Sequence, residues 1–163
     1  MTIKYFLGLG SNIDPRETNL TRACEKLGKL GRIVKRSAIY RTSPWGEPDQ
    51  PDFYNAVIEF DTTLAAQPLL SAVKQIEKDM GRRPAERWGP RNIDIDILFS
   101  PDISINETTL HIPHGELFNR EFVLVPMAEI AADLQMKRDG KTVAECLAAC
   151  PNHSVIEKLE INW

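Results

Sequence analysis

The sequence contains few cysteines and no long apolar run. Its 163 residues include three cysteines, an odd number that does not fit a disulfide framework and is more typical of a reducing compartment. No apolar segment reaches the length of a signal-peptide core or a membrane span, and strand-like sequence follows Met1 almost at once. These absences argue against a secreted or membrane-inserted protein, and we expect a cytoplasmic one.

Neither sign of charge dominates the sequence. The 20 Lys and Arg residues and the 23 Asp and Glu residues are well mixed and give a net charge of −3. This is not the pattern of a nucleic-acid-binding or membrane-binding protein. Linkers and internal repeats are also lacking, and a chain of this length can bury a core without metal or disulfide support. We therefore expect one domain, residues 1–163, that acts as a monomer on small molecules.

Two amphipathic helices are predicted in the first half of the chain. The first begins with Asp14 as its N-cap and Glu17 closing a capping box, and it is expected to end at Gly31. The second ends with Gly81 at the C′ position. Beyond residue 100 the pattern predicts a hairpin over 103–112, a Pro-bounded segment over 122–131 and a last helix over 142–149 that a second capping box opens.

Strands are predicted where apolar residues alternate or run together, at 3–10, 33–40, 53–60 and 94–99. With the helices they give the order β-α-β-β-α-β. This is the split βαβ pattern of a ferredoxin-like α+β fold, an antiparallel sheet with both long helices packed on one face. The fold hosts enzymes, RNA binders and small-molecule sensors, so it does not identify the function.

Residues 87–99 carry the strongest chemical signal in the sequence. Asp94 and Asp96 alternate with isoleucines, so both carboxylates are expected on one face of a strand, with their Cα atoms roughly 7 Å apart. Such a pair could ligate one Mg²⁺ or hold two ions jointly. Four arginines that suit phosphate oxygens precede or flank the pair: Arg82, Arg83, Arg87 and Arg91. The stretch predicts a phosphate-and-metal site, against the alternative of an exposed strand face with surface arginines.

Other functions remain open on residue chemistry alone. His111 and His114 could suggest zinc, although oxygen ligands and Mg²⁺ suit phosphate chemistry better. A non-catalytic module that binds a metabolite would use the same fold, but it has no need of paired metal ligands. An ordinary kinase that releases ADP is equally compatible with the arginines and carboxylates.

Several motifs, in order along nearly the whole chain, resemble the 6-hydroxymethyl-7,8-dihydropterin pyrophosphokinase family of folate biosynthesis. The similar segments are 5–12, 40–46, 50–56, 86–97, 112–114 and 119–124. The resemblance implies transfer of the terminal pyrophosphoryl group of ATP to the hydroxymethyl group of the reduced pterin, with AMP as the other product. It also implies two Mg²⁺ ions on Asp94 and Asp96, and catalytic roles for Arg82 and Arg91.

The resemblance also implies two sets of ligand-binding residues. Phe53 and Phe122 match the pair that stacks on the pterin, and Asn55 suits the polar edge of the ring. The full pterin set is Thr42, Pro44, Trp45, Phe53, Asn55 and Phe122. The ATP set is Glu77, Arg82, Trp88, Arg91, Ile97, His114 and Arg120. Trp45 is expected to act as a lid and Trp88 either to anchor the catalytic loop or to brace the nucleotide. Gly115 stands where the family often has an aromatic residue.

Overall fold

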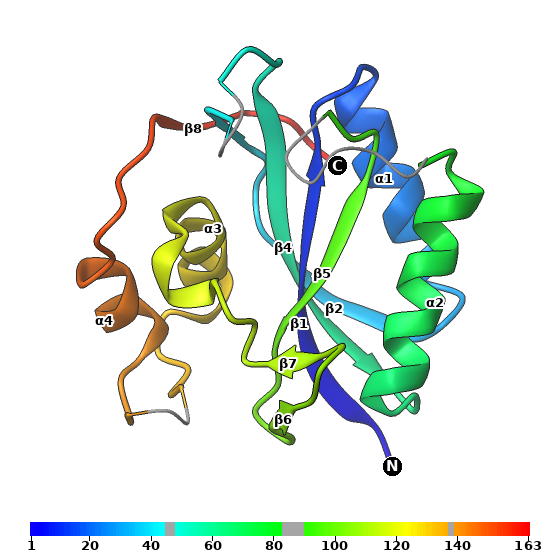
Figure 1. Ribbon diagram of the computed structural model, residues 1–163, viewed down its shortest axis with the longest axis vertical. Helices are drawn as coiled ribbons and strands as arrows, with labels where there is room; N and C mark the ends of the chain where they lie inside the picture. Colours follow the sequence, from blue (N-terminus) through cyan, green and yellow to red (C-terminus); the bar gives the residue numbers. More distant parts are fainter. Residues whose placement is uncertain (45–47, 83–89, 137–138) are drawn as a thin grey trace.

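The computed structural model describes residues 1–44, 48–82, 90–136 and 139–163, and these residues form a central antiparallel sheet (Figure 1). Its strands run in the order β5-β1-β4-β3-β8, and β2 also pairs with β4. Their bounds are β1 Ile3–Ser11, β2 Arg32–Arg36, β3 Tyr40–Thr42, β4 Phe53–Thr62, β5 Asp94–Phe99 and β8 Ile156–Lys158.

Helices cover both faces of the sheet (Figure 1). The long helices α1 (Arg16–Leu27) and α2 (Ala66–Asp79) pack on one face, and α3 (Glu121–Ala131) and α4 (Val143–Ala148) lie on the other. A small hairpin of β6 (Ile105–Asn106) and β7 (His111–Ile112) and the short 3-10 helix η1 (Leu117–Asn119) connect β5 to α3. No helix in the described parts of the chain is long and apolar enough to cross a membrane.

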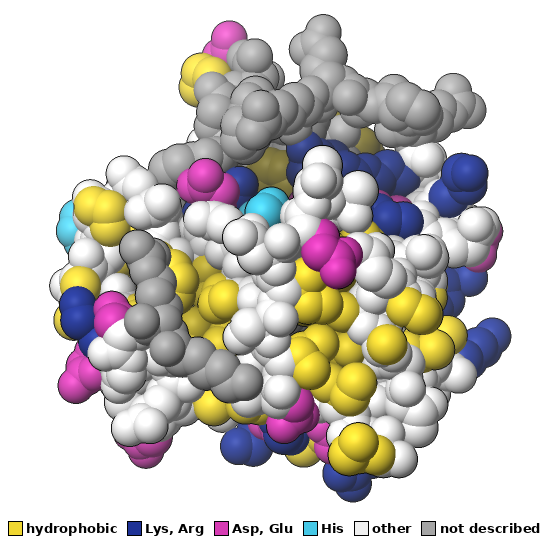
Figure 2. All heavy atoms as spheres, turned by 60° about the horizontal axis from the view of Figure 1, so that its bottom comes forward, with side chains coloured by type: hydrophobic (Ala, Val, Ile, Leu, Met, Phe, Trp, Pro, Cys, Tyr) yellow, Lys and Arg dark blue, Asp and Glu magenta, His cyan; other side chains and the backbone are white. Residues whose placement is uncertain are grey.

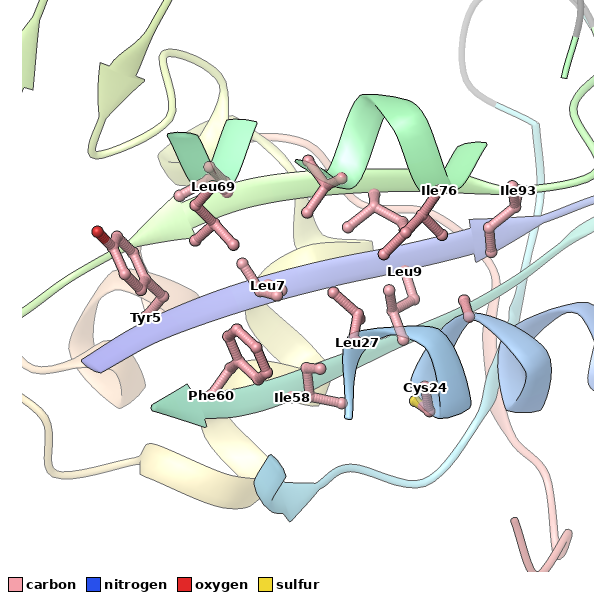
Figure 3. Close-up of a cluster of buried hydrophobic side chains, with 14 of the residues drawn as sticks. Tyr5, Leu7, Leu9, Cys24, Leu27, Ile58, Phe60, Leu69, Ile76 and Ile93 are labelled. Atoms are coloured by element: carbon pink, nitrogen blue, oxygen red, sulfur yellow. The ribbon is translucent and has the colours of Figure 1, made fainter. Parts of the chain in front are cut away.

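The period of two along β1 divides the core into two layers. Tyr5, Leu7 and Leu9 are buried against α1 and α2, as the cluster in Figure 3 shows. Phe6 belongs to the second cluster, with residues of α3 and α4, and Gly8 points to that same face. Apolar side chains are buried on both faces of the central strands, and each Å² of buried apolar surface stabilises the fold by about 25 cal/mol. A shift of one residue would exchange the two faces, so this burial fixes the register of the central strands.

The predicted split βαβ architecture is confirmed. The strand 94–99 is found as β5, the hairpin forms within its predicted bounds, and Thr142 and Glu145 make the predicted reciprocal capping box at α4. The Pro-bounded segment is the helix α3, which contains Pro126.

Two predicted elements differ from the structure. Helix α1 begins at Arg16, and its N-cap, Pro15, makes no side-chain cap. The predicted capping box of Asp14 with Glu17 is therefore wrong: the Asp14 carboxylate pairs instead with Arg16 Nε at 3.0 Å. The helix also ends at Leu27 and not at Gly31.

The predicted strand 33–40 is two strands, β2 and β3. Both pair with β4, and Ser37 lies between them. The Ser37 N–H donates to the Val57 carbonyl at 2.9 Å, and its Oγ accepts from the Val57 N–H at 2.9 Å. A side-chain oxygen thus takes the place of a backbone acceptor, which interrupts the ladder without leaving the Val57 peptide unpaired.

Figure 2 shows how side chains are distributed on one face of the molecule. Hydrophobic side chains gather in its middle, acidic and basic side chains are interspersed around them, and a group of Lys and Arg side chains lies toward the top. On this face the charges are mixed, as the sequence predicts, apart from that basic group.

We predict that Gly31→Ala lowers the free energy of unfolding by about 1–3 kcal/mol. A Cβ at this position would lie 2.3 Å from the Asp61 carbonyl oxygen, so the chain entering β2 would have to move away from β4. Gly28→Ala is the matched control, because Gly28 has right-handed helical dihedrals and its nearest atoms lie 3.4 Å away. Urea unfolding followed by circular dichroism measures both. Equal stability of the two variants would contradict the steric argument.

Candidate functional site

A pocket opens on the α3 face of the sheet, over β1 and between β4 and β5. Its empty volume, including the space open to solvent, is about 720 Å³. Its lining comes from four parts of the fold, namely β1, the β3–β4 region, β5 with Arg91, and the start of α3. The residues are Gly8, Leu9, Gly10, Thr42, Ser43, Phe53, Asn55, Ala56, Val57, Arg91, Asp94, Asp96, Leu98, Arg120, Phe122 and Val123.

Two glycines form the floor of this pocket. Gly10 lies between Asp94 of β5 and Asn55 of β4, and Gly8 lies between Asp96 and Val57. A Cβ on Gly10 would stand 2.7 Å from Asn55 Oδ1, so a larger residue would displace that amide. Sequence reasoning did not place these two glycines in the site. Their alternation with Leu7 and Leu9 was the available signal.

Asp94 and Asp96 emerge on one face of β5, as predicted, because Ile93, Ile95 and Ile97 are buried on the other face. The side chain of Asp94 is 19% exposed and carries two ion pairs. Its Oδ1 lies 2.8 Å from a guanidinium nitrogen of Arg82, and its Oδ2 lies 3.0 Å from one of Arg91. Both predicted catalytic arginines therefore meet on one predicted metal ligand.

The two carboxylates have opposite pKa shifts. Burial acts to raise the pKa of Asp94, but Arg91 and Arg82 outweigh it and hold that pKa below its ordinary value. The pKa of Asp96 is raised by burial and by the negative charge of Asp94. The two carboxyl groups therefore influence each other's ionisation: once Asp94 carries its negative charge, ionisation of Asp96 beside it is unfavourable. A nearby divalent cation would favour the doubly ionised form.

The end of α2 directs Arg82 toward Asp94. Gly81 has φ +91°, a left-handed conformation that glycine adopts without steric cost, and it terminates the helix as predicted. The N–H of Gly81 donates to the Lys78 carbonyl and the N–H of Arg82 to the Glu77 carbonyl, both at 3.0 Å. This pair of bonds is a Schellman motif, and it turns the chain toward β5.

Glu77 lies behind the carboxylate pair and is only 3% exposed. Its Oε1 accepts from the Ile95 N–H at 2.8 Å and its Oε2 pairs with Arg82 at 2.9 Å. Burial raises the pKa of Glu77, although Lys74 and Arg82 oppose that effect. Its carboxylate thus supports the free edge of β5 and the position of Arg82, and it does not line the pocket.

Four residues of the predicted pterin set meet at the other side of the pocket. Thr42 and Phe53 are paired across β3 and β4, and Asn55 Nδ2 donates to Thr42 Oγ1 at 2.7 Å. Phe122 reaches the pocket from the first turn of α3. Pro44 is half-buried in the segment after β3 and is not among the lining residues, and Trp45 lies outside the described residues.

The predicted ATP set is brought together only in part. Arg91 and Arg120 line the pocket, and the His114 N–H donates to the Leu98 carbonyl at 2.8 Å, next to β5. The side chain of Ile97 is 3% exposed and lies in the core beneath the sheet, so a nucleotide contact at this residue falls to its backbone. Trp88 lies outside the described residues, as do Arg83 and Arg87.

No group of three His, Cys, Asp or Glu side chains that could hold a metal occurs within the described ranges. His111, from the zinc alternative, has its Nδ1 2.9 Å from Asn106 Oδ1 on the hairpin. The carboxylate pair on β5 therefore offers only part of a coordination shell.

Comparisons with known proteins agree with the geometry. The family model described as 7,8-dihydro-6-hydroxymethylpterin-pyrophosphokinase (HPPK) matches residues 6–132. A 2-amino-4-hydroxy-6-hydroxymethyldihydropteridine pyrophosphokinase of Methylorubrum extorquens is 45% identical over 159 residues, which is 96% of this chain and 99% of that protein. The protein of the same name from Haemophilus influenzae is 36% identical over 95% of this chain and 98% of its own length.

A solved structure supports the fold. The crystal structure of Plasmodium falciparum HPPK-DHPS has a TM-score of 0.74 at 16% identity, and the match covers 91% of this chain and 43% of that longer chain. Together with the sequence relatives, these findings place the chain in the 7,8-dihydro-6-hydroxymethylpterin-pyrophosphokinase family, whose members transfer pyrophosphate to hydroxymethyldihydropterin in folate synthesis.

Proposed function

We propose that the pocket over Gly8 and Gly10 is where this pyrophosphoryl transfer takes place, with Asp94 and Asp96 holding two Mg²⁺ ions. The observation that carries the proposal is the pair of ion contacts that Arg82 and Arg91 make to opposite oxygens of Asp94. Carboxylates that suit Mg²⁺ and guanidinium groups that suit phosphate oxygens are thus gathered at one end of a pocket.

The donor chemistry of the carboxylate pair fits magnesium. Asp94 and Asp96 offer hard oxygen ligands on one strand face, and the glycines opposite them leave the space above the strand open. Mg²⁺ is commonly held by one or two carboxylates, with substrate phosphates and water completing its octahedron, so a partial shell is what a nucleotide site requires. When bound, the two ions would neutralise the phosphate chain and the developing charge on the attacking hydroxymethyl oxygen.

The arginines have a second set of partners available once ATP is present. Arg82 and Arg91 hold the ionised form of Asp94 in the structure described here. Cations that share one carboxylate with a metal repel that metal, so metal binding favours movement of both guanidinium groups onto phosphate oxygens. There they stabilise charge on the transferring group and help to hold it in line with the pterin oxygen.

The opposite end of the pocket suits the pterin ring. Phe53 and Phe122 supply two flat apolar faces from different layers of the fold. Asn55 supplies amide donors and an acceptor for the pyrimidinone edge, and its bond to Thr42 fixes its orientation. A ring held there directs its hydroxymethyl group toward the carboxylates, since Asn55 and Asp94 lie on either side of Gly10.

We propose that the adenine lies along the free edge of β5, where Ile97 contributes its backbone. The Ile95 N–H points away from β1 toward Glu77, and backbone groups two residues apart point the same way in an antiparallel strand. The Ile97 peptide groups therefore face the same open edge. Arg120 and His114, near the end of β5 that continues toward α3, are placed to meet phosphate oxygens.

We also propose that residues 1–163 act as one monomeric domain in the cytoplasm. Strands from both ends of the chain, β1 and β8, belong to the same sheet. The three cysteines are buried and free, which fits a reducing compartment. Analytical ultracentrifugation measures the oligomeric state, and a dimer at enzyme-assay concentrations would contradict that part of the proposal.

Asp94→Asn and Asp96→Asn should each lower AMP formation from ATP, Mg²⁺ and the pterin alcohol by about 10³-fold or more, because each removes a metal ligand. Mn²⁺ binding, measured by electron paramagnetic resonance in the presence of an ATP analogue, should weaken in parallel. Asp79→Asn is the control, an exposed carboxylate on α2 that accepts a hydrogen bond from Gln75 Nε2 at 2.8 Å. Wild-type turnover in either β5 variant would remove the metal assignment, and ADP as the product would contradict the reaction itself.

Phe53→Ala and Asn55→Ala should raise the dissociation constant of the pterin by about tenfold or more and leave that of ATP nearly unchanged, because stacking and edge contacts act on the ring alone. Tyr54→Ala is the matched control, since its ring lies on the other face of β4 beneath the Arg16 guanidinium, 4.1 Å away. Titration calorimetry measures both ligands. An equal loss of ATP and pterin binding would indicate a folding defect and not a pterin wall.

Arg82→Ala and Arg91→Ala should lower kcat by on the order of 10³-fold while changing the ATP dissociation constant far less, because their contacts strengthen as charge develops on the transferring group. Single-turnover kinetics at saturating ATP and pterin isolate the chemical step. Arg41→Ala serves as the control, because this half-exposed arginine pairs with Glu157 away from the pocket. An unchanged chemical step in both variants would return the two arginines to the role of structural partners for Asp94.

A further inference from the structure

One buried amide connects the two ends of the pocket. Asn12 follows β1 directly and is 1% exposed. Its Oδ1 accepts from the Arg91 N–H at 2.7 Å, and its own N–H donates to the Arg91 carbonyl at 3.0 Å. Its Nδ2 donates to Gln50 Oε1 at 2.8 Å and to the Pro51 carbonyl at 3.1 Å. Both amide hydrogens and the amide oxygen are thus used.

These partners belong to segments that enter opposite walls of the pocket. Pro51 lies two residues before Phe53, at the start of the pterin-side strand β4. Arg91 lies three residues before Asp94, and its guanidinium meets that carboxylate at 3.0 Å. Asn12 is hydrogen-bonded to both segments through the same side chain, and it is not among the residues that line the pocket.

The rigidity of such a link follows from its burial. A hydrogen bond between buried groups is costly to break, because the donor and the acceptor are then left without a partner and water cannot reach them to replace it. The Arg91 backbone is held on both sides of its Cα, at its N–H and at its C=O, so displacing this residue requires both bonds to break. The side chain of Arg91 can then move between Asp94 and a phosphate while its backbone stays fixed.

We propose that Asn12 is a positioning residue that sets the distance between the Arg91 guanidinium and the pterin wall. This inference rests on the role proposed above for Arg91 in phosphoryl transfer, and it concerns a residue outside the lining of the pocket. If the backbone of Arg91 moves relative to the bound pterin, its guanidinium is less often in the position that stabilises the transferring group. Misplacement by about 1 Å can lower the rate by on the order of 10²-fold.

A double-mutant cycle between Asn12→Ala and Arg91→Ala tests the proposal, with kcat from single-turnover measurements as the readout. Asn12→Ala is expected to lower kcat by on the order of 10- to 100-fold in the wild-type background and by less than about threefold when Arg91 is already alanine. The pterin dissociation constant should also rise in Asn12→Ala, since the segment that leads into Phe53 loses two bonds. The same factor in both backgrounds would overturn the proposal.

Asn19→Ala is the matched control. Asn19 is likewise buried, and its Nδ2 donates to the Ile13 carbonyl at 3.0 Å and to Ser11 Oγ at 3.3 Å, so it supports the same turn without reaching either wall. It should lower the melting temperature while kcat, measured well below that temperature, stays near wild type. A loss of kcat in Asn19→Ala equal to that in Asn12→Ala would assign the effect to the turn as a whole and overturn the specific link.

The cycle also separates this inference from the proposed site. If Arg91→Ala alone leaves kcat unchanged, the role of Arg91 has failed before Asn12 is considered. If Arg91→Ala lowers kcat but Asn12→Ala does not, the link has failed and the arginine assignment stands. Should Asn12→Ala not fold, Asn12→Ser replaces it, because a hydroxyl on so short a side chain cannot reach both segments.

Discussion

The site depends on the register of β5 in the sheet. Ile93, Ile95 and Ile97 are between 0% and 3% exposed, and their burial against α1 and α2 fixes which way every side chain of this strand points. A slip of one residue would exchange the isoleucines with Asp94 and Asp96 and place two carboxylates in the core, at a cost that is a large part of the stability of a small protein. The apolar core thus determines the orientation of the carboxylates.

The same constraint explains why the glycines of β1 matter. β1 lies between β4 and β5, so any side chain at Gly8 or Gly10 would stand between the pterin side and the carboxylate side of the pocket. The leucines that alternate with these glycines pack the opposite face. One strand therefore combines a tightly packed face with a face that is open to ligand. Glycine at those positions weakens the strand intrinsically, and burial of its other face offsets that loss.

The sequence predicted those features that depend on neighbouring residues and missed those that depend on residues far apart in the chain. Local signals with a strong period or a specific turn chemistry were read correctly, as for β5, the Gly81 terminus of α2 and the capping box at Thr142. The predicted capping box at Asp14 was wrong because Pro15, and not Asp14, is the N-cap residue. The Asp14 carboxylate instead forms an ion pair with Arg16. The division of 33–40 into two strands depends on Ser37 meeting Val57, a contact between residues far apart in the sequence.

The site shows the same limit. Asp94 and Asp96 could be placed on one face from periodicity alone, and the same periodicity places the Ile97 side chain on the buried face. Glu77 binds the backbone of Ile95, and Asn12 binds the backbone of Arg91. Any residue type can supply such a backbone group, so the sequence gives no sign of these contacts. Such side-chain-to-backbone contacts are visible only when the fold is known.

The pocket wall that carries Thr42 depends on backbone contacts to residues outside the range matched by the family model. Thr42 pairs with Phe53 on one side and with Ile156 of β8 on the other, so the strand that orients Asn55 lies between β4 and a C-terminal strand outside residues 6–132. Ahead of β8, the Ser154 N–H donates to Glu121 Oε2 at 2.9 Å, at the start of the helix that carries Phe122. Residues 154–158 therefore join both pterin-side walls through main-chain groups, whose hydrogen bonds place little constraint on residue type. The walls of the pocket can thus stay in place while the sequence of this segment varies.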